Sequence, residues 1–516
     1  MFVFYTYILI ILLITYFQKK ELLKGVFKSS KKTTWFISGI SLFMYYVSVE
    51  QGQVITGVLA AQGMWGLWIF WSSLLGAFVL PFVFAPLWSK LDFITDNQFL
   101  LFRYSGFSAK VLHAFRAFYV GGLVVSMLLS FHVLAFSRVI EFYFQTDKIS
   151  SILITGFILI LFTLKNSFQI KLKTDFFHSL IYFLVLFISF YYLYKTSGGL
   201  KLAINNFSHS GPYKLNLLPP SEIKFAWTSW IAFVFIQWWS AQMFDGGGPE
   251  MARFTAVKGK RNAILTALFP ILLYALLSFF IVIMAILVLS FQQTNSGESQ
   301  FIYTIFKIVP ESFKALCLLG FFGMFITTAE SQLNWGGSFL TIDLYKKYLN
   351  PKKSEKHFQV VSFFSMLLLS LCCVIIALNI DSLQGLLKLV FSISAGVAPV
   401  YILRWFWYRI NAWSQLSAMI SSGVYTLLFP FFFNKNNIVY GFAFEEARLI
   451  VVTVLTSLTW LMVTFLTKKD EDENIERMKK IIPDKKTIVT QFALAFGMGL
   501  GVLLLVLLIW KLILSI

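Results

Sequence analysis

Long apolar runs recur along the whole of this 516-residue chain, and they constrain its fold more than any other feature. A helix needs about 20 predominantly apolar residues to cross the hydrocarbon core of a bilayer. Only 13% of the residues are charged, whereas soluble proteins have about 25%. The sequence therefore predicts an all-α polytopic membrane protein with about fourteen transmembrane helices, near residues 2–17, 34–57, 65–88, 111–143, 150–166, 174–195, 225–243, 263–291, 313–345, 358–379, 383–408, 413–433, 447–467 and 487–515.

The net charge of +19 indicates membrane topology rather than nucleic-acid binding. Lysine and arginine cluster in short connections that all fall on one side of the predicted bundle, among them 18–32, 165–173, 251–261 and 345–357. By the positive-inside rule that side is the cytoplasm, which places both termini outside the cytoplasm. We therefore expect a multi-pass inner-membrane protein whose surroundings are the lipid bilayer, with no nucleic-acid partner and no obligatory protein partner evident.

Several classes of catalytic protein are excluded by missing motifs. The sequence has no GxxxxGK[ST] motif for nucleotide binding and no HExxH motif for zinc. Its five histidines are scattered, and its three cysteines lie singly or as one adjacent pair in apolar runs. We expect neither an enzyme nor ATP-driven transport through this chain.

A polar stretch, "FITTAESQLNWGG" at 325–337, interrupts the longest apolar pattern. Thr327 and Thr328 lie near the middle of the predicted span, and Met324 and Ser331 share their helical face by the i, i+3, i+4, i+7 rule. Two hydroxyls and nearby carbonyls form a hard-oxygen site suited to an alkali cation. Alternatively, these hydroxyls bond to their own helix or to neighbouring helices.

Glu330 and Asn334 follow at i, i+4 on a different face of the same helix. A carboxylate inside the membrane is a functional hypothesis, here a relay or an ion-binding group. A purely structural ion pair with an arginine such as Arg138 is the alternative.

Two further interruptions predict discontinuous helices. The first is "SVEQGQ" at 48–53, and the second is "QWWSAQMFDGGGPEMARF" at 237–254, with Arg253 expected at the cytoplasmic exit. A broken helix offers backbone carbonyls and amides to a ligand at mid-depth, and corresponding breaks in two halves indicate a secondary transporter with inverted repeats. The tryptophans of the second break either line the cavity or belong to an interfacial belt.

These motifs together resemble the sodium:solute symporter family, which includes sodium–sugar, sodium–proline and sodium–sialic acid carriers. "SQLNWGGSFLTIDLYKKYLNP" at 331–351 is similar to the S-x-x-N…D-x-Y-(K/R) stretch of that family. "SVEQ" at 48–51 resembles its S-x-E-Q, and "KTD" at 173–175 resembles its T-D at the fifth core helix. The resemblance departs at Phe70, where the sodium–galactose carrier has a glutamate.

The resemblance implies the leucine-transporter (LeuT) fold, a 5+5 inverted-repeat helical bundle. The implied segments are an N-terminal extra helix and basic connection (1–33), the first repeat (34–195), an extracellular connection (196–224), the second repeat (225–408) and flanking C-terminal helices (409–516).

The resemblance also implies the site residues. Sodium would be bound by the Met44, Val47 and Met324 carbonyls and the Thr327 and Thr328 hydroxyls, with Asp175 as a coupling residue below them. The solute would contact a second set: Glu50, Gln51, Ser73, Gln237, Trp238 and Trp239.

We therefore expect a sodium-coupled symporter that imports a small organic solute, a monosaccharide or a related neutral or acidic metabolite, by alternating access. One alternative is a proton-coupled carrier that uses Glu330 or Asp175. Another is a transporter-like membrane sensor.

Overall fold

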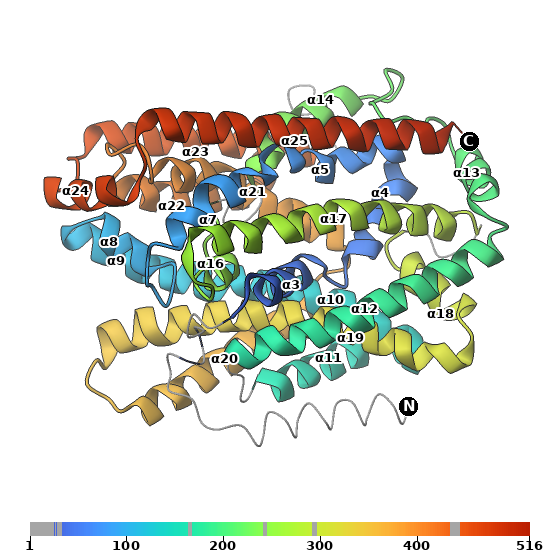
Figure 1. Cartoon of the computed structure of the whole chain (residues 1–516), viewed down its shortest axis with the longest axis horizontal. Coiled ribbons are helices and arrows are strands. Elements are labelled where there is room, and N and C mark those ends of the chain that lie inside the picture. The colour runs from blue at the N-terminus through green and yellow to red at the C-terminus, as the bar shows by residue number, and fades with distance from the viewer. Residues whose placement is uncertain are drawn as a thin grey trace. The chain divides into compact units, whose positions relative to one another are not determined.

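The computed structural model describes residues 25, 27, 33–163, 168–240, 245–291, 297–433 and 444–515. Within those residues every regular element is a helix (Figure 1). The first predicted span, 2–17, lies outside the described residues.

Ten described helices are long and apolar enough to cross a membrane: Met64–Trp88, Gly106–Phe144, Phe168–Thr196, Gly259–Leu289, Glu311–Leu349, Glu355–Leu378, Leu383–Leu403, Ala412–Phe432, Phe444–Leu466 and Lys485–Leu514. Three shorter apolar helices are Trp35–Tyr46, Lys148–Leu161 and Ala226–Gln237. These bounds confirm an all-helical, multi-pass membrane protein. The count of about fourteen spans stays a prediction.

The first of two compact units comprises Met1–Gly63, Ala117–Lys214 and Ala252–Gln384. Its helices are α3 (Trp35–Tyr46), α4 (Gln51–Gln62), η3 (Tyr119–Val124), α10 (Val125–Phe144), α11 (Lys148–Thr163), α12 (Phe168–Thr196), α13 (Leu200–His209), α17 (Gly259–Leu289), α18 (Gln300–Ile308), α19 (Glu311–Ser338), η5 (Phe339–Leu349) and α20 (Glu355–Leu378).

The second unit comprises Met64–Arg116, Leu215–Met251 and Gly385–Ile516. Its helices are η1 (Met64–Leu67), α5 (Trp68–Trp71), α6 (Leu74–Ala77), η2 (Leu80–Phe84), α7 (Ala85–Trp88), α8 (Gln98–Arg103), α14 (Ala226–Ala232), η4 (Phe233–Gln237), α15 (Trp238–Ser240), α22 (Ala412–Phe432), α23 (Phe444–Leu466), α24 (Asp472–Ile481) and α25 (Lys485–Leu514). Three helices have residues in both units: α9 (Gly106–Phe118), α16 (Pro249–Phe254) and α21 (Leu383–Leu403). The division of the chain into two inverted repeats stays a prediction.

The first predicted helix break is present between α3 and α4. The last hydrogen bond of α3 runs from the Val47 amide to the Phe43 carbonyl, and α4 begins at Gln51. The final carbonyls of an α-helix have no partner within the helix. The break therefore leaves the carbonyls of the last turn of α3, from Met44 onward, beyond its α-helical ladder.

The second predicted break follows Ser240, after which the structure next describes Asp245. Residues 245–248 are not helical, and α16 begins at Pro249. Gly246 and Gly248 have φ angles of 73° and 63°, which glycine adopts without the steric cost that a side chain brings. The glycine run thus turns the chain before α16.

Helix α19 lies at the centre of the first unit, where it packs against α3, α10, α12 and α20. Figure 1 shows α12 alongside α19, and glycines allow their close approach. A Cβ at Gly320 would lie 2.8 Å from Val185 Cγ2, and one at Gly323 would lie 3.3 Å from His178 Cβ. These small residues let α12 approach α19 closely between His178 and Val185, just before the polar stretch of α19.

Candidate functional site

The two threonines of the polar stretch are buried on α19, which is unbroken there. Thr328 Oγ1 donates to the Met324 carbonyl at 3.2 Å, and Ser331 Oγ donates to the Thr327 carbonyl at 2.8 Å. Both bonds stay within α19, as in the alternative that these hydroxyls bond to their own helix. Thr328 Oγ1 keeps its two lone pairs when it donates its bond, so the hydroxyl remains able to bind a cation.

The other proposed sodium ligands lie in the same unit. Met44 and Val47 are fully buried at the end of α3, and Met324 is buried on α19. Helices α3 and α19 pack against each other. Carbonyl and hydroxyl oxygens are the ligands that hard cations prefer, so the chemistry of these donors fits sodium.

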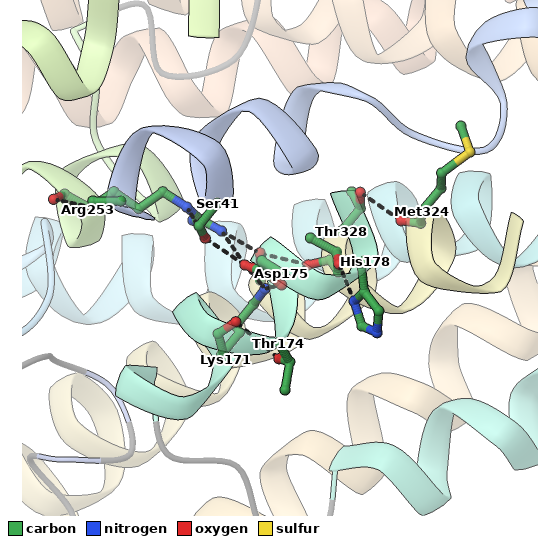
Figure 2. A network of polar contacts seen from close by, with 11 residues as sticks. Ser41, Lys171, Thr174, Asp175, His178, Arg253, Met324 and Thr328 are labelled. Atoms are coloured by element: carbon green, nitrogen blue, oxygen red, sulfur yellow. Dashed lines mark hydrogen bonds and ion pairs between the residues drawn. The ribbon is translucent and has the colours of Figure 1, made fainter. Parts of the chain in front are cut away.

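Asp175 is the centre of a buried polar network (Figure 2). Its carboxylate accepts a hydrogen bond from Ser41 Oγ on α3 at 2.5 Å. The Lys171 ammonium, one helical turn earlier on α12, lies 3.0 and 2.9 Å from the two carboxylate oxygens. Sequence reasoning assigned Lys171 to a cytoplasmic connection and began the span at 174. That assignment is wrong, because α12 begins at Phe168 and buries the lysine side chain completely.

Arg253 is also part of this network, and its predicted place at the cytoplasmic exit stays a prediction. It is fully buried, and its guanidinium donates to Ser41 Oγ and to Ser331 Oγ, both at 3.0 Å. Its Nη2 lies 3.7 Å from Asp175 Oδ2. Ser38 Oγ donates in turn to the Arg253 carbonyl at 3.0 Å. Arg253 thus connects α16 to α3 and α19.

His178 connects the same region of α12 to the proposed sodium ligands. Its Nδ1 lies 2.9 Å from Thr327 Oγ1, and the ring is buried. The Thr327 carbonyl accepts a further bond from Lys171 Nζ at 3.0 Å. Thr327 is therefore the residue at which the network around Asp175 meets the proposed sodium site.

Glu330 is buried on α19. The alternative that pairs it with Arg138 is wrong, because Arg138 forms its ion pair with Glu298 at 2.9 Å. Asn334 is half-buried, and its Nδ2 has no hydrogen-bond partner in the described part of the chain.

The first broken helix carries a buried acidic group. Ser48 Oγ donates to Glu50 Oε1, and His132 Nδ1 of α10 lies 3.1 Å from Glu50 Oε2. Gln51 is buried beside them, and its Oε1 has no hydrogen-bond partner within the described ranges. The structure thus brings the two polar candidates of this break together and adds His132, which sequence reasoning had counted only among scattered histidines.

The remaining solute candidates belong to the second unit. Ser73 is half-buried and Gln237 is buried. Trp239 Nε1 donates to the Ala395 carbonyl at 3.2 Å, and Trp238 packs edge-on against Phe496, with ring centroids 5.0 Å apart. Both indoles therefore have packing roles within their own unit.

Lys171, His178 and His132 are the site residues that sequence reasoning missed. The one available indication for Lys171 was its spacing, because i, i+4 places it on the helical face of Asp175. No group of three or more His, Cys, Asp or Glu side chains able to hold a metal occurs among the described residues.

Known proteins match this chain both in sequence and in fold. The profile of the sodium:solute symporter family matches residues 27–422. The chain is 21% identical over 454 residues to the osmoregulated proline transporter OpuE of Bacillus subtilis (strain 168), an alignment that covers 84% of this chain and 88% of that protein. It also matches the solved structure of a Na⁺-coupled sialic acid symporter in a substrate-bound, outward-open state. The TM-score is 0.72 at 15% identity, over 91% of this chain and 98% of the other, so the two share a fold.

Proposed function

Because the chain belongs to the sodium:solute symporter family, we propose that it imports a small organic solute together with sodium by alternating access. The family and the matched proteins are transporters, so the chain is a transporter and not an enzyme. The proposal places it in the inner membrane with both termini outside the cytoplasm.

The observation that carries the sodium proposal is the buried pair of hydroxyls on Thr327 and Thr328. They lie on α19, the helix that packs against α3. The Met44 and Val47 carbonyls at the end of α3 and the Met324 carbonyl complete the proposed ligand set. Asp175 is proposed to couple this site to the polar network beneath it.

On the solute side, Glu50 and Gln51 offer acceptor oxygens at the break of the first broken helix. A buried acceptor without a partner costs free energy, so the Gln51 amide oxygen favours a solute that donates a hydrogen bond. Ser73, Gln237, Trp238 and Trp239 are proposed as further contacts. The proposed solute stays a monosaccharide or a related neutral or acidic metabolite, and the proline and sialic acid carriers among the matched proteins support the neutral or acidic metabolite.

Coupling follows from reciprocal binding. If sodium stabilises the outward-open form, it tightens solute binding, and the solute tightens sodium binding by the same factor, typically about 1–3 kcal/mol. The membrane potential adds about 2.3 kcal/mol of driving force for each sodium at 100 mV.

The proposal is tested by the thermal stability of the purified protein in sodium and in equal potassium or choline, for the wild type and for Thr328→Ala. A ligand present at a hundredfold excess over its Kd raises stability by about 2.7 kcal/mol. We expect a sodium-specific rise that is lost in the variant. Equal stability of the wild type in all three cations would rule out sodium binding by the wild-type chain.

Uptake into proteoliposomes separates the alternatives. Uptake driven by a pH gradient without sodium would favour a proton-coupled carrier that uses Glu330 or Asp175. Sodium-driven net flux of a solute would rule out a sensor that keeps only the carrier fold.

A further inference from the structure

The Lys171 ammonium is bound in the way that a free cation would be. An ammonium group has three N–H donors, and Lys171 Nζ has three oxygen neighbours: both carboxylate oxygens of Asp175, at 3.0 and 2.9 Å, and the Thr327 carbonyl at 3.0 Å. Its side chain has no exposed surface. Figure 2 shows Lys171 and Asp175 directed toward each other.

The oxygens that hold this ammonium adjoin the proposed sodium ligands. Thr327 presents its carbonyl to Lys171, and its hydroxyl is one of the proposed sodium ligands. Sodium and the ammonium group are both monovalent cations that bind oxygen. A change in the position of one therefore acts on the other through Thr327 and Asp175.

Two basic groups already face the Asp175 carboxylate. Lys171 Nζ lies 2.9 Å from Asp175 Oδ2, Arg253 Nη2 lies 3.7 Å from the same oxygen, and all three side chains are fully buried. An added sodium ion would bring a further positive charge to this cluster, and uncompensated buried charge is strongly unfavourable.

We propose that the Lys171 ammonium is an electrostatic competitor of the coupling cation: bound to Asp175 and the Thr327 carbonyl, it places a positive charge beside the sodium ligands, and sodium binds tightly only when the ammonium moves away from them. This inference rests on the proposed sodium site. It makes Lys171 a residue that sets sodium affinity, rather than only a partner that keeps Asp175 in place.

The test is a sodium titration of thermal stability at constant ionic strength, with potassium as the replacement ion, on the purified full-length chain. Lys171→Met removes the charge at similar length. One positive charge is then missing beside Asp175 and sodium is repelled less, so the half-saturating sodium concentration should fall by about tenfold or more, equivalent to about 1.4 kcal/mol. Lys171→Gln keeps an N–H donor for Asp175 and gives the same comparison if the methionine variant does not fold.

Lys173→Met is the matched control, because Lys173 lies on the same helix two residues on and is exposed. Its half-saturating concentration should equal that of the wild type. If Lys171 had a structural role alone, its replacement would lower stability equally in sodium and potassium without moving the titration midpoint.

The outcomes distinguish this inference from the function on which it rests. A wild-type sodium response whose midpoint is unchanged or raised in the Lys171 variants overturns the inference and leaves the sodium site standing. A response that appears only in the Lys171 variants supports the inference. No response in any variant, Lys171→Met included, overturns both.

Discussion

His178 Nδ1 and Thr327 Oγ1 lie 2.9 Å apart across the contact between α12 and α19. The histidine thereby fixes the position of a hydroxyl that is proposed to bind sodium. Because Gly323 admits the histidine side chain so closely, the bond depends on the packing of the two helices as well as on the two residues.

Replacement of His178 by phenylalanine should weaken sodium binding. The ring volume is largely kept, whereas the bond that positions Thr327 is lost. A hydrogen bond contributes about 1 kcal/mol net, so we expect the half-saturating sodium concentration to rise about fivefold in the thermal titration. His357→Phe is the control, because the His357 ring contacts Tyr345 of η5 instead. An equal shift in both variants would contradict the positioning role.

Replacement of the His132 imidazole should weaken solute uptake and leave the rise of thermal stability in sodium unchanged. His132 and Ser48 both contact the Glu50 carboxylate, and hydrogen bonds to charged groups contribute about 1.5–3 kcal/mol. We expect His132→Phe to raise the KM for solute uptake by at least about tenfold. Uptake into proteoliposomes measures the KM, and the thermal titration of the same preparation measures the sodium response. An unchanged KM would show that Glu50 needs no such support.

Gly63→Ala should destabilise the protein more than Gly106→Ala. Both glycines have positive φ angles, 84° and 71°, and Gly63, with a ψ of −164°, lies in a region that is essentially restricted to glycine. A Cβ at Gly63 would also lie 2.7 Å from the Lys214 carbonyl oxygen, whereas one at Gly106 meets nothing within 4 Å. The difference between the melting temperatures of the two variants measures the added backbone and steric cost at Gly63. An equal fall in melting temperature for both variants would show that the backbone around Lys214 shifts at little cost.

Within the second unit, Asp245→Ala should be strongly destabilising. Asp245 and Arg404 are fully buried, with Arg404 Nη2 2.6 Å from Asp245 Oδ2, and Trp405 Nε1 also donates to that oxygen at 2.9 Å. Removal of one partner of a buried ion pair costs about 3–5 kcal/mol, because it leaves the other charge uncompensated. We expect a large fall in melting temperature and in yield.

The double variant Asp245→Ala, Arg404→Met should recover much of that loss, because it removes both charges together. Its melting temperature should therefore lie above that of Asp245→Ala alone. A double variant as unstable as the single one would assign the loss to packing around Asp245 rather than to the charge of Arg404.

The sequence predicted well the features that follow from local polarity. A glutamate and two glutamines beside a glycine cannot continue a lipid-facing helix, and the structure breaks there, between Tyr46 and Gln51. The burial of Thr327 and Thr328 could be expected in the same way, since hydroxyls in a long apolar run need a protein environment.

The depth of charged residues could not be predicted in this way. Lys171 and Arg253 both lie in basic segments that the positive-inside rule assigns to the cytoplasmic surface. Their partners are Asp175 on the same helix and Ser41 and Ser331 on others. Only tertiary packing brings these partners together, and a long side chain in a basic run gives no indication of it.

Because of the break between α3 and α4, the two sides of the proposed sodium site differ in how readily they move. Three of its ligands lie on α19, which is continuous from Glu311 to Ser338, while Met44 lies in the last turn of α3 and Val47 directly follows it. The end of a helix rearranges when a few backbone dihedral angles change, whereas a packed continuous helix moves as one body. We therefore expect movement of the end of α3, relative to a stationary α19, to determine how long the sodium ion stays bound.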